Sequence, residues 1–216
     1  MPTTSEIKAF YDNYIDNLDK FTTRHEAVLH TFDIMVSKEF NVLDIGCGTG
    51  ITTKHLAGLA KSVIGVDLSP VLIEHAIKNN SKPNSQYFAA DIVEWDWPSK
   101  FDFISMVDVF EHIPLERIPT FMNTLKKFSY DNTQIYLNIP TGDVIRYLKK
   151  NYPESLQIVD VPHDDVLDCF KTIDFYPTYF KVYWVQYVEY IFETEVSINK
   201  RFDEIFQPLK RSNYNG

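Results

Sequence analysis

The sequence predicts an α/β fold in which helices cover both faces of a parallel sheet. Short apolar segments rich in β-branched residues alternate with longer segments whose apolar residues recur at helical spacing. Strands that alternate with helices indicate βαβ units, which build parallel sheets. The apolar segments are nearly continuous, which is typical of strands that are buried on both faces.

Length and charge limit the classes of function. The chain has 216 residues, enough for one domain with a sizeable core. Its formal charge of −9 disfavours generic nucleic-acid binding, because an acidic surface repels phosphates. The 2 cysteines are far apart in the chain, which favours a reducing compartment over a disulfide framework. Neither a signal peptide nor an apolar run of about 18 residues is seen, so we expect a cytoplasmic protein without a membrane span.

The expected elements follow in order along the chain. Residues 5–40 are expected to be helical, because apolar side chains recur there at helical spacing. Five strands are expected next, at NVLDIG (41–46), SVIGVDL (62–68), SQYFAADI (85–92), FDFISMVDV (101–109) and TQIYLNI (133–139). The helices expected between them are ITTKHLAGLAK (51–61), SPVLIEHAIKNN (69–80) and LERIPTFMNTLKKF (115–128). Ser69 as N-cap and Pro70 as first helical residue mark the start of the second helix.

The pattern weakens after Pro140. GDVIRYLKKNY (142–152) is expected to be a helix, and HDDVLDCFKTIDF (163–175) a short helix that runs into a strand. The aromatic segment 174–192 is expected to form one or two strands rather than a wall around a flat ligand.

The segment VLDIGCGTG places three glycines, Gly46, Gly48 and Gly50, between a strand and a helix. Glycines allow a tight turn and let a ligand approach the backbone, while the helix N-terminus presents free N–H groups. The spacing matches neither the dinucleotide fingerprint G-x-G-x-x-G nor a phosphate loop. Asp44 precedes the glycines, and its carboxylate would repel a pyrophosphate and attract an ammonium group. The loop therefore indicates a ligand with an amino acid part.

Two further acids end the next two strands. Asp67 can accept hydrogen bonds from both hydroxyls of a ribose. Asp91 can accept from an adenine amino group, with Ile92 against the ring. Together with Asp44, these acids describe an adenosine that carries a cationic amino acid.

At this point the sequence resembles a class I S-adenosylmethionine-dependent methyltransferase. VLDIGCGTG, VIGVDLSP, FAADI and FDFISMVDVFEHIP resemble the first four motifs of that family, in order and at its spacing, over residues 35–140. The resemblance implies a Rossmann-like, doubly wound sheet of seven strands, one of them antiparallel, and an N-terminal helical cap. The cofactor-binding residues that it implies are Asp44, Gly46, Cys47, Gly48, Asp67, Leu68, Asp91, Ile92, Val107, Tyr11 and Tyr14.

We expect a single domain with three regions. Residues 1–35 would form the helical cap and residues 36–140 the cofactor-binding core. Residues 141–216 would supply substrate-side helices and the C-terminal strands. The oligomeric state stays open.

The stretch DVFEHIP (108–114) follows the fourth strand, so we expect it beside the cofactor, and three interpretations stay open. In the first, Glu111 accepts backbone N–H groups and His112 shapes the pocket wall. In the second, His112, whose unperturbed pKa is about 6.5, is a general base. In the third, Asp108, Glu111, His112 and His163 hold a divalent metal, as the similar E-x-x-E-H of ubiquinone-biosynthesis O-methyltransferases does. Aspartate shortens the first ligand by one methylene, so a metal is not expected.

The expected function is methyl transfer to a small molecule, with Glu111 and His112 as the catalytic candidates. A hydroxyl acceptor such as a sugar, a glycan precursor or a phenol comes first. The alternatives are an amine acceptor, or a catalytically silent protein that binds the cofactor or a partner.

Overall fold

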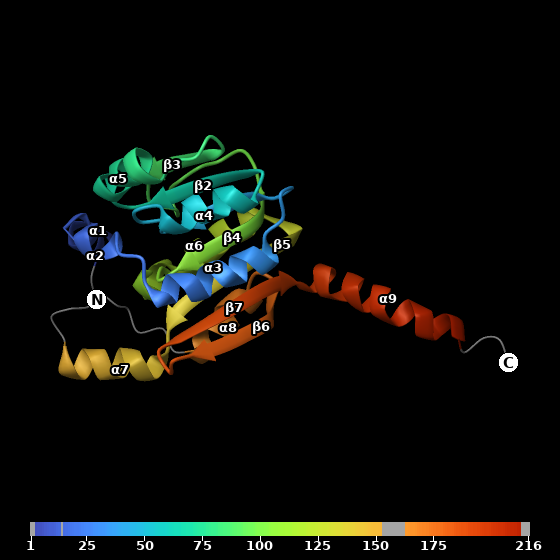
Figure 1. Ribbon diagram of the computed structural model, residues 1–216. Helices are drawn as coiled ribbons and strands as arrows, with labels where there is room; N and C mark the ends of the chain where they lie inside the picture. Colours follow the sequence, from blue (N-terminus) through green and yellow to red (C-terminus); the bar gives the residue numbers. More distant parts are fainter. Residues whose placement is uncertain (1–2, 14, 153–162, 213–216) are drawn as a thin grey trace.

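The computed structural model describes residues 3–13, 15–152 and 163–212 (Figure 1). The strands are β1 (Asn41–Ile45), β2 (Ser62–Asp67), β3 (Ser85–Ala89), β4 (Phe101–Val107), β5 (Ser129–Pro140), β6 (Phe175–Tyr183) and β7 (Tyr187–Thr194). The α-helices are α1 (Thr4–Asp12), α2 (Ile15–Leu18), α3 (Thr23–Met35), α4 (Ile51–Leu59), α5 (Pro70–Asn80), α6 (Ile118–Lys127), α7 (Gly142–Asn151), α8 (His163–Lys171) and α9 (Glu195–Ser212). Two short 3-10 helices, η1 (Phe110–His112) and η2 (Leu115–Arg117), lie between β4 and α6.

A seven-stranded sheet forms the centre of the molecule. Its strand order is β3-β2-β1-β4-β5-β7-β6. Strands β1 to β5 pair in parallel, whereas β7 pairs antiparallel with both of its neighbours, β5 and β6. The expected seven-stranded sheet with one antiparallel strand is confirmed.

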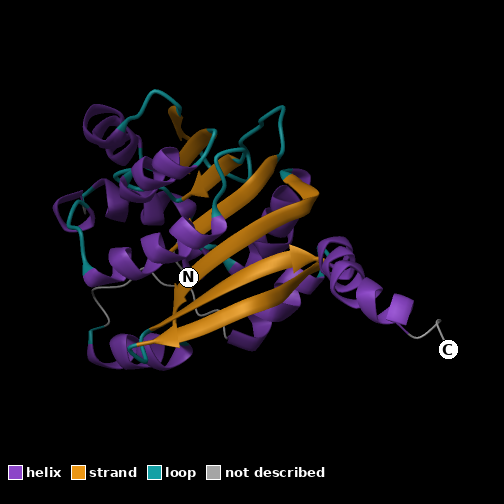
Figure 2. Ribbon diagram, turned by 45° about the vertical axis from the view of Figure 1, so that its right-hand side comes forward, coloured by secondary structure: helices purple, strands orange, loops and turns teal. Residues whose placement is uncertain are grey.

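Helices cover both faces of this sheet (Figures 1 and 2). On one face, Phe32 of α3 and Leu56 of α4 belong to one buried cluster with Phe103 of β4, and α5 packs beside α4. On the other face, Phe121 of α6 and Phe170 of α8 belong to the second buried cluster. The strands are nearly continuously apolar because both of their faces are covered.

The helix starts follow local capping signals. The Ser69 hydroxyl accepts from the Leu72 N–H at 3.1 Å, and Pro70 is the first residue of α5, as predicted. Residues 5–40, expected to be helical, contain three separate helices, and the last of them ends at Met35. Thr22 has an extended backbone, and its side chain caps the start of α3. Helix α3 is therefore separate from the helices that precede it.

The C-terminal part contains one expected and one unexpected feature. The aromatic segment forms β6 and β7, as predicted. Helix α9 was not expected, and it projects away from the sheet (Figures 1 and 2). Across the described ranges, every helix is too short or too polar to cross a membrane.

Candidate cofactor and acceptor site

A cavity of about 790 Å³ lies at the carboxyl ends of β1, β2 and β4, with α1 as one of its walls. Parallel pairing of these strands brings the loops that follow them together. The sequence-predicted residues that line the cavity are Tyr11, Gly46, Cys47, Gly48, Asp67, Leu68, Asp91, Ile92, Val107, Asp108, Glu111 and His112. Tyr14 lies outside the described residues, and so does the side chain of His163, whose backbone begins α8.

The glycine loop is a tight turn that only glycine can form at its first position. Gly46, Gly48 and Gly50 have φ angles of 66°, 52° and 84°, in the left-handed region. The Gly46 N–H donates to the Val66 carbonyl at 2.8 Å, which folds the loop back onto β2. A Cβ atom on Gly46 would lie 2.2 Å from Cγ2 of Val109, so the loop also packs directly against the chain after β4.

Asp44 does not line the cavity, which corrects the expectation that its carboxylate meets the ligand. The side chain is buried and accepts from the hydroxyls of Ser105 and Thr53 at 2.6 Å and of Thr52 at 2.8 Å. Burial raises the pKa of Asp44, and the three hydroxyls oppose that rise. Neighbouring side chains of a strand point to opposite faces, and the cavity wall is formed by Ile45 instead. Asp44 therefore ties the start of α4 to β4 beneath the glycine loop.

Asp67 lines the cavity and also holds the loop backbone. One carboxylate oxygen accepts from the Gly48 N–H and the other from the Ser69 N–H, both at 2.9 Å. Each oxygen keeps a second lone pair, so the carboxylate can still accept from ligand hydroxyls. Burial raises the pKa of the Cys47 thiol well above its ordinary value, and the charges of Asp67 and Asp44 add to this. Cys47 is therefore a neutral packing residue.

Asp91 is joined to the cap through Arg117, a residue that the sequence did not single out. Arg117 Nη1 donates to Asp91 Oδ2 at 2.6 Å and to the hydroxyl of Thr4, in α1, at 2.8 Å. The other oxygen of Asp91 accepts from the Val93 N–H at 3.1 Å. Arg117 thus connects the loop after β3 to the start of the cap helix.

The cap reaches the loop after β4 through a tyrosine and a histidine. The Tyr11 hydroxyl lies 2.8 Å from Nε2 of His112, and the two rings meet edge to face at 5.4 Å between centroids. Both residues line the cavity. Helix α1 forms a wall of the cavity, and there a phenol oxygen and an imidazole nitrogen share one hydrogen bond.

Arg24 fixes the opposite wall of the cavity. Its Nη1 donates to Asp108 Oδ2, while Nη2 and Nε donate to Asn138 Oδ1 at 2.8 and 3.2 Å. Its guanidinium carbon lies 4.0 Å from the ring centroid of Tyr187, a cation–π contact. Burial opposes the charged form, but the charge of Asp108 and the hydrogen bond to it raise the pKa of Arg24 above its ordinary value. Arg24 therefore keeps its positive charge, and it contacts Asp108, Asn138 and Tyr187.

Two carboxyl groups beside Arg24 keep unsatisfied oxygens. Asp108 Oδ1 and Glu111 Oε2 are buried and have no hydrogen-bond partner among the described residues, and both side chains line the cavity. Burial raises the pKa of Glu111 well above its ordinary value, and the nearby charge of Asp108 adds to this. A side-chain hydrogen bond between the two carboxyl groups also raises this pKa, so Glu111 keeps a proton that it shares with Asp108.

The predicted metal ligands do not fit a metal site as they stand. Within residues 3–13, 15–152 and 163–212, no group of three or more His, Cys, Asp and Glu side chains could hold a metal ion. Asp108 is paired with Arg24, whose charge would repel a divalent cation. Nε2 of His112 is bonded to Tyr11. The fourth candidate, His163, has a side chain outside the described residues.

Arg24 could have been found from the sequence. It is the second residue after the Thr22 cap, in the first turn of α3, where the helix dipole disfavours a cation. A cation in that position indicates a partner elsewhere in the fold. Arg117 carries no comparable signal, because its contacts depend on where the cap lies.

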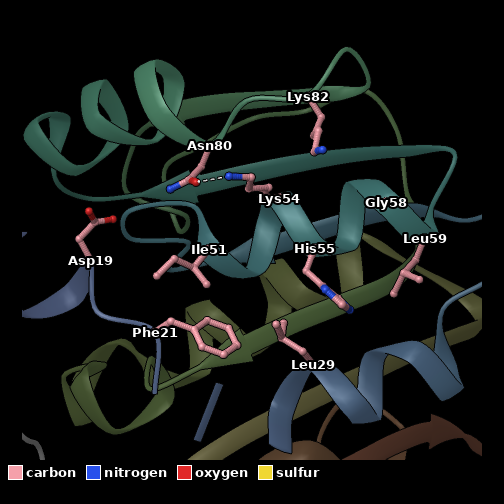
Figure 3. Close-up of a pocket in the computed structure, with 10 residues that line it drawn as sticks. All are labelled: Asp19, Phe21, Leu29, Ile51, Lys54, His55, Gly58, Leu59, Asn80 and Lys82. Carbon is pink, nitrogen blue, oxygen red and sulfur yellow. Dashed lines mark hydrogen bonds between the residues drawn. The ribbon is translucent and has the colours of Figure 1, made fainter. Parts of the chain in front are cut away.

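A second hollow of about 550 Å³ lies away from the strand ends, between α3, α4 and the end of α5 (Figure 3). Lys54 donates to Asn80 Oδ1 at 3.0 Å across it. Its lining residues include none of the sequence-predicted site residues. We therefore do not assign this hollow to the cofactor.

Residues 9–176 match a family model described as "Methyltransferase domain". The chain is 34% identical over 77 residues to the ubiquinone biosynthesis O-methyltransferase of Paraburkholderia phytofirmans, over 34% of this chain and 33% of that protein. It is 36% identical over 81 residues to the mitochondrial ubiquinone biosynthesis O-methyltransferase of Schizosaccharomyces pombe, over 35% and 30% of the two chains. The matched part thus spans about a third of the length of these relatives.

Solved structures share the fold at low sequence identity. The N-methyltransferase NodS of Bradyrhizobium japonicum WM9 in complex with S-adenosylhomocysteine has a TM-score of 0.71 at 16% identity, over 90% of this chain and 100% of that one. Magnesium protoporphyrin IX methyltransferase of Synechocystis PCC 6803 also has a TM-score of 0.71, at 14% identity, over 89% and 100%. The family match, the four motifs and the cavity that they line agree, and the chain belongs to the class I S-adenosylmethionine-dependent methyltransferases.

Proposed function

We propose that this chain transfers a methyl group from S-adenosylmethionine to a hydroxyl group of a small molecule, such as a sugar, a glycan precursor or a phenol. The observation that carries the proposal is the 2.8 Å hydrogen bond between Tyr11 and His112 in the cavity that the glycine loop lines. A hydroxyl acceptor benefits from a base beside the methyl donor, and this pair supplies one.

The loops after the first three strands fit the cofactor, which when bound supplies an electrophilic methyl group on a sulfonium. Gly46 and Gly48 let its amino acid part approach the backbone. Asp67 would accept from the ribose hydroxyls, and Ile92 would pack against the adenine, with Asp91 at its edge. Leu68 and Val107 complete the apolar walls. Asp44 stabilises the glycine loop from beneath, through its hydrogen bonds to α4 and β4.

The acid–base step follows from the Tyr11–His112 pair. When Tyr11 donates its proton to Nε2 of His112, the phenol oxygen can accept the proton of the acceptor hydroxyl. The proton then moves from the acceptor to Tyr11 and from Tyr11 to His112. Arg24, Asp108 and Glu111 lie along the cavity wall and orient the acceptor, because methyl transfer mainly requires alignment.

An amine acceptor is the second candidate. The carboxyl groups of Asp108 and Glu111 would bind an ammonium group before it loses its proton, if its charge displaces the proton that Glu111 shares with Asp108. The same hydrogen-bonded pair could then remove that proton.

We also propose the one-domain organisation, with cap 1–35, core 36–140 and substrate-side region 141–216. The proposed cytoplasmic location is supported by Cys47 and Cys169, which are both free thiols. The expected partner is a small-molecule acceptor.

The test is turnover of S-adenosylmethionine over a panel of hydroxyl and amine acceptors. His112→Ala should lower kcat by about 100-fold or more, because general bases contribute roughly that much. Its affinity for S-adenosylhomocysteine, measured by calorimetry, should stay within about twofold. Tyr11→Phe should lower kcat by about as much, because the acceptor's proton passes through the Tyr11 hydroxyl. His55→Ala, in α4 and away from the cavity, is the matched control.

Two results would contradict the proposal. Unchanged turnover in His112→Ala would return this histidine to a packing role. Failure of the parent protein to bind S-adenosylhomocysteine at millimolar concentration would favour the catalytically silent alternative.

A further inference from the structure

The turn between β6 and β7 places two large apolar residues in a conformation that favours glycine or asparagine. Trp184 and Val185 have φ angles of 53° and 59°, and the Gln186 N–H donates to the Tyr183 carbonyl at 3.2 Å. Tyr183 pairs with Tyr187, so three residues join the strands, and Trp184 and Val185 are the two central residues of the turn, both with positive φ. Large and β-branched side chains are strained there, and such strain is commonly kept for a function.

The strained residues are also open to solvent. Trp184 is 53% exposed and Val185 is 75% exposed. Packing in the core therefore does not explain why apolar side chains occupy the tip of the turn. An exposed apolar tip is typical of a surface that meets a partner.

The turn borders the mouth of the cavity together with α7. The Thr141 hydroxyl donates to the Val185 carbonyl at 2.8 Å, and the Thr141 N–H donates to the Gln186 carbonyl at 2.7 Å, so the N-cap of α7 is joined to the turn. Trp184 lines the cavity, as do Val144 and Leu148 of α7. Figure 1 shows α7 beside the turn, at the same end of the sheet.

The outer face of α7 combines aromatic and basic side chains. Tyr147 and Tyr152 are 58% and 55% exposed. The exposed bases of this helix are Arg146, Lys149 and Lys150. They outnumber its one acid, Asp143, in a chain whose formal charge is −9. Tryptophan and tyrosine beside lysine and arginine are the side chains favoured at a lipid–water boundary.

We propose that this interfacial face, formed by Trp184, Val185 and the outer side of α7, docks on an anionic bilayer surface. The apolar tip enters the headgroup region, and the bases of α7 meet the lipid phosphates. An acidic protein is repelled by such a surface except where its bases gather, which fixes the orientation. The cavity mouth then faces the bilayer, from which the acceptor would enter. The proposal does not depend on whether that acceptor is a hydroxyl or an amine.

Co-sedimentation of the full chain with vesicles tests the proposal. Mixed vesicles of phosphatidylcholine and phosphatidylglycerol should bind the protein about tenfold more tightly than phosphatidylcholine alone, since each base adds to the attraction. Salt should weaken this binding. Lys149→Glu with Lys150→Glu should remove the preference for the mixed vesicles.

The decisive variant keeps the fold and removes the apolar tip. Trp184→Asn with Val185→Gly creates the preferred sequence for this turn, so the melting temperature should stay equal or rise. Binding to mixed vesicles should fall by about tenfold or more, because the inserted apolar area is lost. Ile34→Ser, an exposed apolar site in the last turn of α3 at the other end of the sheet, should bind as the parent does.

Three outcomes would overturn the proposal. The first is a parent protein that binds neither vesicle at low salt. The second is a Trp184→Asn/Val185→Gly variant that binds mixed vesicles as tightly as the parent. The third is a parent dimer that the double variant breaks and that binds no vesicle, which would make this face a contact between copies.

Discussion

The two halves of the cavity differ in how completely their polar groups are paired. In the cofactor half, Asp67 accepts from two backbone N–H groups, and Asp44, buried beneath the glycine loop and outside the cavity, accepts from three hydroxyls. In the acceptor half, Asp108 and Glu111 each have one buried oxygen whose only contact within the described part of the chain is the proton that Glu111 shares with Asp108. The cofactor half is thus preorganised by its own contacts, whereas the acceptor half leaves polar atoms that a ligand would satisfy.

The backbones of the two halves differ in the same way. In the cofactor half, the residues with positive φ are glycines of the loop. In the acceptor half they are Asp108 and Trp184, and Val185 follows directly; the conformation is strained for Trp184 and Val185, whereas aspartate tolerates it, as it does at Asp174 outside the cavity. Of the cavity's two halves, the acceptor half therefore contains the strained side chain, at Trp184.

The largest expected effect comes from a single methyl group in the cofactor half. In Gly46→Ala, the added Cβ would lie 2.2 Å from Val109 at a φ angle of 66°, so the loop must move. We expect affinity for S-adenosylhomocysteine to fall by about 100-fold or more in calorimetry, because a displacement of about 1 Å at such a site has effects of that size.

The matched control is Gly58→Ala in α4. An added Cβ there meets nothing within 4 Å, so the variant should bind as the parent does and gain up to about 1 kcal/mol of stability. Parental affinity in Gly46→Ala would mean that the cofactor half is less rigid than its hydrogen bonds indicate.

The next largest effect is expected in the acceptor half, from Arg24→Ala. The Arg24 side chain is only 18% exposed, and its removal leaves the carboxyl groups of Asp108 and Glu111 without a cation. The Asp108 side chain is 34% exposed, so solvent screens part of this pair, and we expect the free energy of unfolding to fall by about 1 to 3 kcal/mol in urea denaturation.

Arg146→Ala is the control for this loss. Its ion pair with Asp143 joins side chains that are 69% and 78% exposed, so the change should stay within about 0.5 kcal/mol. A double-mutant cycle with Asp108→Asn should show a coupling above about 1 kcal/mol between Arg24 and Asp108. If Arg24→Ala and Arg146→Ala lose the same free energy of unfolding, the ion pair of Arg24 contributes no more to stability than the exposed pair of Arg146.

The sequence predicted the cofactor half better than the acceptor half because its signals are local. The glycine spacing and the acids at the strand ends lie within short segments, and the fold places Asp67 and Asp91 in the cavity as expected. The side chain of Asp44 lies outside the cavity, and the sequence does not show this because its hydroxyl partners in α4 meet it only once α4 packs on the sheet. Arg24 and Asn138 are 114 residues apart, so their contact depends on the assembled fold and no local pattern encodes it.

The smallest expected effect is a change in pH dependence, from Glu111→Gln. In the folded protein the pKa of Glu111 lies well above the ordinary value of 4.5, so the folded state keeps a proton that the unfolded chain releases. Stability therefore falls as pH rises from about 4.5 towards the folded pKa, by about 1.4 kcal/mol for each pKa unit between the two states. Glutamine does not titrate, so the variant should lose less stability than the parent over this range in thermal melts.

The difference between the stability curves of Glu111→Gln and the parent reports on Glu111 alone and not on the acids of the cofactor half. Asp44 and Asp67 also have raised pKa values, but both remain in the variant, so their contribution cancels between the two curves. Glu39→Gln, at an exposed position, should keep the pH dependence of the parent. If Glu111→Gln does the same, Glu111 is charged in the folded protein. The acceptor half would then hold two negative charges beside Arg24, which would favour a cationic amine over a hydroxyl as the acceptor.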